Sequence, residues 1–148
     1  MDIFIMNSDG TQLTRLTNSD AWYSQADWSP DGSRIALLAA ESKVSGDADL
    51  AVLDLTSGEL TRITEGPAID MEPSWSPDAA QIAFSSDRDG ALDIYTLNVD
   101  SGEITQLTQD AGDNNHPDWS PDGKKILFVS SRDGDEEIYV MDADGANP

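Results

Sequence analysis

The sequence has no cysteine among its 148 residues. A disulfide framework and thiolate chemistry are therefore excluded, while the redox compartment is left open. Long apolar runs are also missing, since none approaches the roughly 18 residues that a membrane helix needs. A repeated strand pattern begins directly after Met1, so we expect no signal peptide. The chain is long enough for one domain with a core of its own.

Basic residues are scarce as well. Lys and Arg number 8 against 29 Asp and Glu, which gives a formal net charge of −21. A surface of this sign repels nucleic acid and anionic membranes, so we expect neither as a partner. It favours cationic partners or divalent cations, although such a charge also serves simply to keep a protein soluble.

The most informative feature present is a repeat of four residues, Trp-Ser-Pro-Asp. It occupies positions 28–31, 75–78 and 119–122, at intervals of 47 and 44. A period in this range indicates a supersecondary unit that stacks on copies of itself. We expect the tryptophans to pack between units, in preference to forming a stacking platform for sugars or bases. The residues assigned this structural role are Trp28, Pro30, Asp31, Trp75, Pro77, Asp78, Trp119, Pro121 and Asp122.

Each copy predicts four short strands joined by tight turns, and no segment has the capped 3.6-residue periodicity of a helix. The first strand ends on the tryptophan and is expected over 26–28, 73–75 and 117–119. Ser-Pro-Asp-Gly then forms a turn, because proline presets φ and glycine permits positive φ. Ala79 replaces that glycine in the second copy, so we expect its turn to differ slightly. The first copy also carries three extra residues in the loop from Ala39 to Gly46.

Four short strands per repeat are typical of a β-propeller blade. Residues 1–17 match a third and fourth strand, 18–64 and 65–108 each match a blade, and 109–148 match a first, second and third strand. Closed propellers have about four to eight blades, so three blades' worth cannot close a ring. We therefore predict an all-β propeller segment of four-stranded antiparallel blades that forms a six-bladed ring as a homodimer.

Three longer motifs extend the repeat, at 84–90 (Phe-Ser-Ser-Asp-Arg-Asp-Gly), 119–126 (Trp-Ser-Pro-Asp-Gly-Lys-Lys-Ile) and 138–145 (Ile-Tyr-Val-Met-Asp-Ala-Asp-Gly). With these motifs the chain closely resembles TolB-type propeller repeats. The resemblance implies a blade architecture, a role in binding partner proteins, and a periplasmic or extracellular location. Related blades also occur in prolyl-oligopeptidase-like enzymes, but the Gly-x-Ser-x-Gly motif of their hydrolase domain is absent here, as is the additional N-terminal domain of TolB proteins.

Candidate contacts for a protein or peptide partner lie in the loops that enter the first strands. Trp22 and Tyr23 form an aromatic pair that we expect to be exposed, with local packing of a longer loop as the alternative. The single histidine, His116, matches Gln25 and Glu72 in the other copies, so a polar residue there is positional. In a closed ring we expect a group of polar residues to converge at the channel mouth: Asp70, Glu72, Asp113, Asn115 and His116.

Several aspartates lie close together in hairpin turns that contain glycine. Hard oxygen ligands in such a turn suit calcium, although the spacing is not that of an EF-hand loop, and Asp and Gly also serve the turn itself. The candidate ligands are Asp87, Asp89, Asp93, Asp133 and Asp135. We expect no other cofactor.

No nucleophile and base form a catalytic pattern, so we expect no enzyme activity in this chain. The sequence favours a non-catalytic module that self-associates and binds a protein or peptide through its loop face. Two alternatives remain open: a fragment of a larger propeller-containing enzyme or receptor, and a propeller stabilised by a divalent cation.

Overall fold

The computed structural model describes residues 1–148 except 19, 42–45 and 110–111, so the centre of the extended loop from Ala39 to Gly46 lies outside the described residues. The described part contains thirteen strands and no helix, and all strand pairs within the sheets are antiparallel. The predicted all-β class is confirmed. In particular, these residues include no helix long and apolar enough to cross a membrane.

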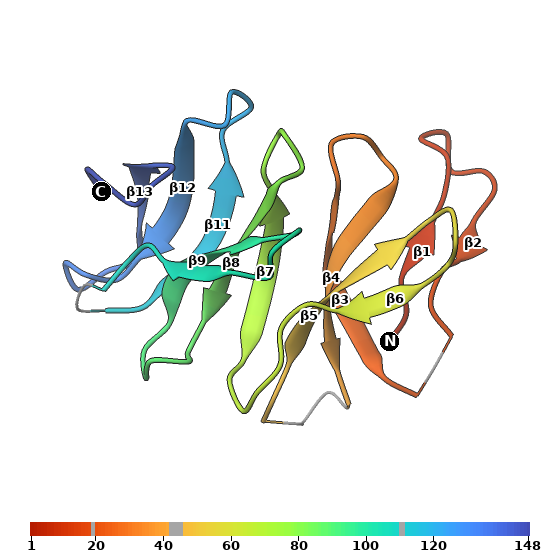
Figure 1. The fold of residues 1–148 in the computed structure, drawn as a ribbon, viewed down its shortest axis with the longest axis horizontal. Helices are drawn as coiled ribbons and strands as arrows, with labels where there is room; N and C mark the ends of the chain where they lie inside the picture. Colours follow the sequence, from red (N-terminus) through yellow and green to blue (C-terminus); the bar gives the residue numbers. More distant parts are fainter. Residues whose placement is uncertain (19, 42–45, 110–111) are drawn as a thin grey trace.

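The strands form four sheets that follow one another in chain order along the long axis of the molecule (Figure 1). The N-terminal ribbon consists of β1 (Phe4–Ile5) and β2 (Thr14–Arg15). The first blade consists of β3 (Trp22–Trp28), β4 (Arg34–Ala40), β5 (Asp49–Asp54) and β6 (Leu60–Arg62). The second consists of β7 (Asp70–Trp75), β8 (Gln81–Ser86), β9 (Asp93–Asn98) and β10 (Ile104–Gln106), and the third of β11 (Asn114–Trp119), β12 (Lys125–Ser130) and β13 (Glu137–Asp142).

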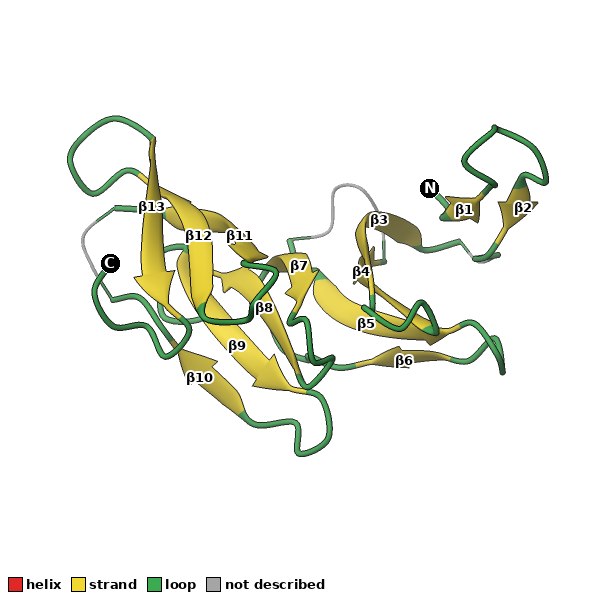
Figure 2. Ribbon diagram, turned by 90° about the horizontal axis from the view of Figure 1, so that it is seen from above, coloured by secondary structure: helices red, strands yellow, loops and turns green. Residues whose placement is uncertain are grey.

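Within each blade the strands pair in sequence order. Figure 2 shows β3, β7 and β11 on one side of the stack, with β6 and β10 on the opposite side. The first strands begin three or four residues before the predicted starts, at Trp22, Asp70 and Asn114. They therefore include the polar segment that the sequence had assigned to loops, and this segment forms the candidate site below.

The core lies between blades, because alternate residues of each central strand point to opposite faces. In β4, Leu37 packs toward the N-terminal ribbon, whereas Ala36 joins a cluster with Phe84 of the second blade. In β8, Phe84 faces the first blade and Ala83 packs with Phe128 of the third. An interior blade therefore needs a neighbour on both sides.

The tryptophans differ in burial according to their neighbours. Trp75 is 4% exposed and packs in the cluster between the first and second blades. Trp119 is partly buried against the second blade. Trp28 is 47% exposed, contrary to the expected packing between blades. On its side the described chain provides only the N-terminal ribbon, which leaves a hollow of about 320 Å³ beside Trp28.

The Ser-Pro-Asp turns share one hydrogen-bond pattern. Ser29 Oγ donates to Asp31 at 2.6 Å and accepts from the N–H of Arg34 at 2.9 Å. The same two contacts recur at 76–78 and 120–122. Hydrogen bonds, first from the Ser29 hydroxyl and then from Ser33, lower the pKa of Asp31 to about 2. The carboxylate is therefore ionised and acts as the acceptor that closes the turn.

The prediction that Ala79 changes its turn was wrong. Ala79 has a φ of 59°, close to the 69° of Gly32 and Gly123. Its N–H donates to the Ser76 carbonyl at 2.9 Å, as that of Gly32 does to the Ser29 carbonyl at 2.8 Å. Left-handed backbone costs an L-residue about 1–2 kcal/mol. The turn thus keeps its geometry, and Ala79 carries the strain.

Exchanging alanine and glycine at this turn position should change stability in opposite directions. Ala79→Gly removes the left-handed strain but adds chain entropy and loses a methyl contact with the core, so we expect a gain of about 0.5 kcal/mol in the free energy of unfolding. Gly32→Ala adds a Cβ that meets no atom within 4 Å, so it should lose about 1 kcal/mol through φ alone. Urea unfolding measures both, and changes of the same sign would contradict this account.

Candidate functional site

The inner-edge groove runs across the first strands of the three blades, β3, β7 and β11. Each of these strands is interrupted by a register shift, between Ser24 and Asp27 in β3 and at the equivalent places in β7 and β11. Gln25, Glu72 and His116 lie in the shifts with φ of 51°, 58° and 51°. Such a bulge releases a backbone N–H from the ladder within its own sheet, and it does so at the same place in every blade.

The released N–H groups of the second and third blades bind side chains of the preceding blade. The N–H of Glu72 donates to Gln25 Oε1 at 3.0 Å, and the N–H of His116 donates to Glu72 Oε2 at 2.8 Å. Glu72 also accepts from Ser85 Oγ at 2.8 Å and lies 3.0 Å from the His116 ring Nε2. Glu72 is thus the central acceptor between the second and third blades, and its side chain is only 12% exposed.

A second row of contacts lies two residues further along each strand. Asp27 Oδ2 accepts from the N–H of Trp75 at 2.7 Å. Ser74 Oγ accepts from the N–H of Trp119 at 3.4 Å and donates to Asp118 Oδ1 at 3.2 Å. In the first and second blades, the residue before the repeat tryptophan therefore joins its blade to the next one.

The groove has a volume of about 380 Å³ and is lined by residues of both rows. Three carboxylates line it, those of Asp27, Glu72 and Asp118, together with the exposed ring of His116. Partial burial raises the pKa of Asp27, opposed by the hydrogen bond from Trp75. This surface can accept hydrogen bonds from N–H groups and attract positive charge.

The predicted mouth residues are only partly brought together. Glu72 and His116 are in contact, and Asn115 Oδ1 lies 2.9 Å from His116 Nδ1. Asp70 lies elsewhere, because its buried carboxylate pairs with Arg88 at 2.8 Å. Asp113 lies directly before β11, and its N–H donates to Ser131 Oγ at 2.9 Å.

The prediction that Trp22 and Tyr23 are exposed was wrong. Both belong to β3, where neighbouring side chains point to opposite faces. Tyr23 is 7% exposed within the cluster toward the N-terminal ribbon. Trp22 is partly buried against a cluster that includes Leu38 and Met71. Local packing, the alternative for this pair, describes both residues.

The candidate calcium ligands serve several separate contacts. Asp89 accepts from the Tyr95 hydroxyl at 2.8 Å. Asp133 repeats this contact with Tyr139 at 2.5 Å. Asp93 accepts from Thr108 Oγ at 2.7 Å. Among the described residues, no three His, Asp or Glu side chains are grouped so that they could hold a metal ion, so calcium binding stays an untested prediction for Asp87, Asp89, Asp93, Asp133 and Asp135.

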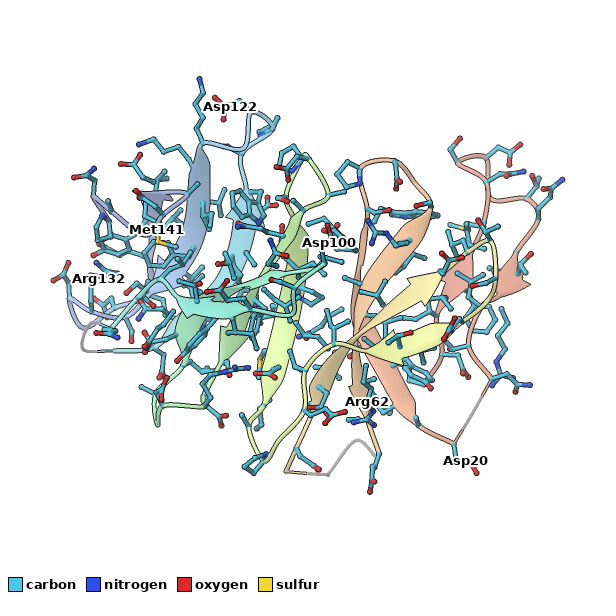
Figure 3. The ribbon with its side chains drawn as sticks, viewed as in Figure 1. Asp20, Arg62, Asp100, Asp122, Arg132 and Met141 are labelled. Carbon is cyan, nitrogen blue, oxygen red and sulfur yellow. The ribbon has the colours of Figure 1, made fainter. Side chains whose placement is uncertain are left out.

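The arginine of the Arg-Asp-Gly loop has a structural role in the second and third blades. Arg88 lies over the rings of Phe84 and Tyr95, at 5.3 and 5.0 Å from the ring centres. Arg132 repeats this stacking in the third blade, at the end opposite the turn of Asp122 (Figure 3). These loops thus stabilise their own blades through cation–π contacts.

Asp27, Ser74 and Asp118 were missed as site residues at the level of sequence. The one sequence feature that could have identified them is their position directly before each repeat tryptophan. These positions hold Asp or Ser, and their contacts depend on a bulge two residues earlier that the sequence does not predict.

The geometry of stacked four-stranded sheets agrees with comparisons to known proteins. A family model described as the TolB beta propeller domain matches residues 27–104 and 88–148. The chain belongs to this family. No curated protein among those compared matches it.

Solved TolB structures resemble the whole segment. TolB from Acinetobacter baumannii shares 28% identity at a TM-score of 0.86, over 97% of this chain and 35% of that one. Putative TolB from Agrobacterium tumefaciens shares 30% at 0.87, over 99% of this chain and 54% of that one. An oligogalacturonate lyase from Vibrio parahaemolyticus, at 18% identity and a TM-score of 0.65 over 93% of this chain and 40% of that one, shares the fold alone. The chain therefore spans only part of the length of the TolB proteins that it resembles.

Removing the Glu72 acceptor should loosen the contact between the second and third blades. Glu72→Ala leaves the N–H of His116 and the hydroxyl of Ser85 without their partner, so we expect a loss of about 1–3 kcal/mol in the free energy of unfolding. Glu72→Gln keeps an acceptor oxygen and should lose less. Denaturant unfolding compares the two variants, and equal losses would show that the acceptor is not what matters.

Asp27 and Asp31 should have opposite effects on the pH dependence of stability. The pKa of Asp27 is raised above 3.8, so its ionisation disfavours the native state as the pH rises through that raised pKa. Asp31 has a pKa of about 2, so its ionised carboxylate stabilises the native state fully above pH 3.8. This stabilisation is lost as the pH falls through about 2. Asp27→Asn should therefore gain stability relative to the unsubstituted protein as the pH rises from about 4 to 7.

Asp31→Asn serves as the matched control for Asp27→Asn. It should be less stable than the unsubstituted protein at neutral pH, and the difference should shrink as the pH falls through about 2, where Asp31 becomes protonated. Melting temperatures across the pH range test both substitutions. Parallel pH profiles for the two variants would refute the assignment.

Proposed function

We propose that this chain is a non-catalytic binding module that supplies three blades' worth of a TolB-like propeller, and that further blades bury its two end sheets. The observation that carries the proposal is the position of the exposed apolar side chains. Among the described residues, the large apolar side chains with the greatest exposure all lie in or beside the end sheets: Met1, Phe4, Met6, Leu13 and Trp28 at one end, and Leu127, Ile138 and Val140 at the other.

The two end sheets have complementary strands. The N-terminal ribbon pairs β1 with β2, and by alignment with the repeat these are third and fourth strands. The third blade has its first three strands, and its edge strand β13 exposes Ile138 at 75% and Val140 at 51%. An open apolar edge of this kind invites pairing with another strand. A β2-type strand placed beside β13 would complete a four-stranded blade.

We propose that a second copy of this chain supplies the further blades that cover the two end sheets. Two copies provide six blades, and each end sheet then faces its complement in the partner. The charge of −21 per chain opposes this association, so apolar contacts must outweigh the repulsion. Added salt should help, because it screens the repulsion.

A longer polypeptide is the second source that an observation favours. The matched TolB structures are longer than this chain, which covers 35% and 54% of them. In that case the further blades, together with any hydrolase or receptor domain, belong to the same protein. The packing requirement at the two ends is the same.

The binding role rests on the inner-edge groove. Its two rows of contacts hold Glu72, Asn115 and His116 at fixed places on a rigid sheet edge, with the His116 ring exposed. Preorganised polar groups lose little freedom on binding. In a closed ring the groove would become part of the channel wall and would present carboxylates to a protein or peptide segment.

Solution mass tests whether a second copy supplies the missing blades. The 148-residue polypeptide should have twice the 15.9 kDa of one chain, with the dimer fraction increasing with salt. Ile138→Glu should reduce the mass to that of one chain, because it puts a charge on the apolar edge. Thr61→Glu adds the same charge on the exposed part of β6 and should leave the dimer intact. A monomer at every concentration would reject self-association and leave the longer polypeptide as the source.

A further inference from the structure

A hollow beside Trp119 separates the second and third blades at their turn ends. It has a volume of about 670 Å³ and is open to solvent on one side. Its walls include the Trp119 ring, Leu107, and the carboxylates of Asp78, Asp122 and Asp144. We call this site the Trp119 hollow. Its size is within the range of ligand-binding pockets, about 300–1,000 Å³.

The equivalent place between the first and second blades is occupied by an arginine. The guanidinium carbon of Arg34 lies 4.7 Å from the centre of the Trp75 ring. Arg34 is the first residue of β4, and the first residue of β8 is Gln81. Gln81 lines the Trp119 hollow, and no cation of the described residues lies over Trp119. One blade interface thus contains a stacked guanidinium, and the next has the same aromatic ring without one.

The charge of the hollow suits a cation. Hydrogen bonds from the Ser76 and Ser120 hydroxyls lower the pKa values of Asp78 and Asp122, so both carboxylates are ionised at neutral pH. The Asp122 turn is exposed at the end of the third blade (Figure 3). A planar guanidinium stacks on an indole and is weakly hydrated, so it binds such a site better than an ammonium does.

We propose that the Trp119 hollow binds the guanidinium of an arginine side chain supplied by a partner protein or peptide. This guanidinium would stack on the Trp119 ring as that of Arg34 stacks on the Trp75 ring. Both walls belong to this chain, so the hollow is present in a single copy of it. The competing occupant is a fourth strand added beside β13, whose apolar side chains would fill the same space.

N-acetyl-arginine methylamide is the probe for this site, and the indole N–H resonances of Trp119 and Trp75 are the readout by heteronuclear NMR. The probe should shift the Trp119 resonance saturably at millimolar concentration and leave that of Trp75 unchanged, since Arg34 already covers Trp75. The corresponding citrulline derivative is neutral and of the same shape. It should bind about tenfold more weakly, because the charged contact is lost.

Two substitutions exchange the properties of the two interfaces. Gln81→Arg should abolish probe binding by filling the hollow, and Arg34→Gln should create a second responding site at Trp75. Absence of a saturable Trp119 shift, equal binding of the citrulline derivative, or undiminished binding to Gln81→Arg would each overturn the proposal. A Trp119 shift that follows protein concentration and is insensitive to the probe would assign the hollow to an added strand instead.

Discussion

Every full blade of this chain has two apolar faces, and the rest of the structure depends on covering both. Successive side chains of the central strands β4 and β8 point to opposite neighbours. Ala36 and Ala83 face the sheet that follows their own blade, whereas Leu37 and Phe84 face the sheet that precedes it. A blade therefore cannot be satisfied alone or at the end of a stack. Trp75 and Trp28 have the same place in the repeat but are 4% and 47% exposed. Their difference reflects only what lies beside them.

Apolar packing brings the blades together, but the hydrogen bonds of the inner-edge groove fix how they align. Packing between apolar surfaces is not directional, whereas the bonds from Glu72 N–H to Gln25 and from His116 N–H to Glu72 require one register between adjacent blades. The bulges that release these N–H groups also force non-glycine residues to positive φ. The strain is therefore part of the interface, and the same residues give the groove its polarity.

Much of the architecture could be predicted from the Trp-Ser-Pro-Asp spacing, because a turn with fixed chemistry marks the same point in each blade. The contacts of Ser29 and Asp31 recur at the equivalent residues of the other two copies. The candidate site was harder to predict, because Asp27 and Ser74 act through a bulge that the residues before them do not reveal. The burial of Tyr23 was also missed. The sequence pattern assigned Tyr23 to a loop, but β3 begins before it, so its side chain packs in the core.

Hydrogen exchange at β13 tests most directly whether further blades cover the ends of this stack. The relevant amides are those of Glu137–Asp142 that point away from β12. If a further strand completes the third blade in solution, these amides should be protected as strongly as those of β9, which lies between two strands. Rapid exchange of the outward amides of β13 in the 148-residue polypeptide, together with strong protection of β9, would contradict completion of the third blade by a second copy of this chain.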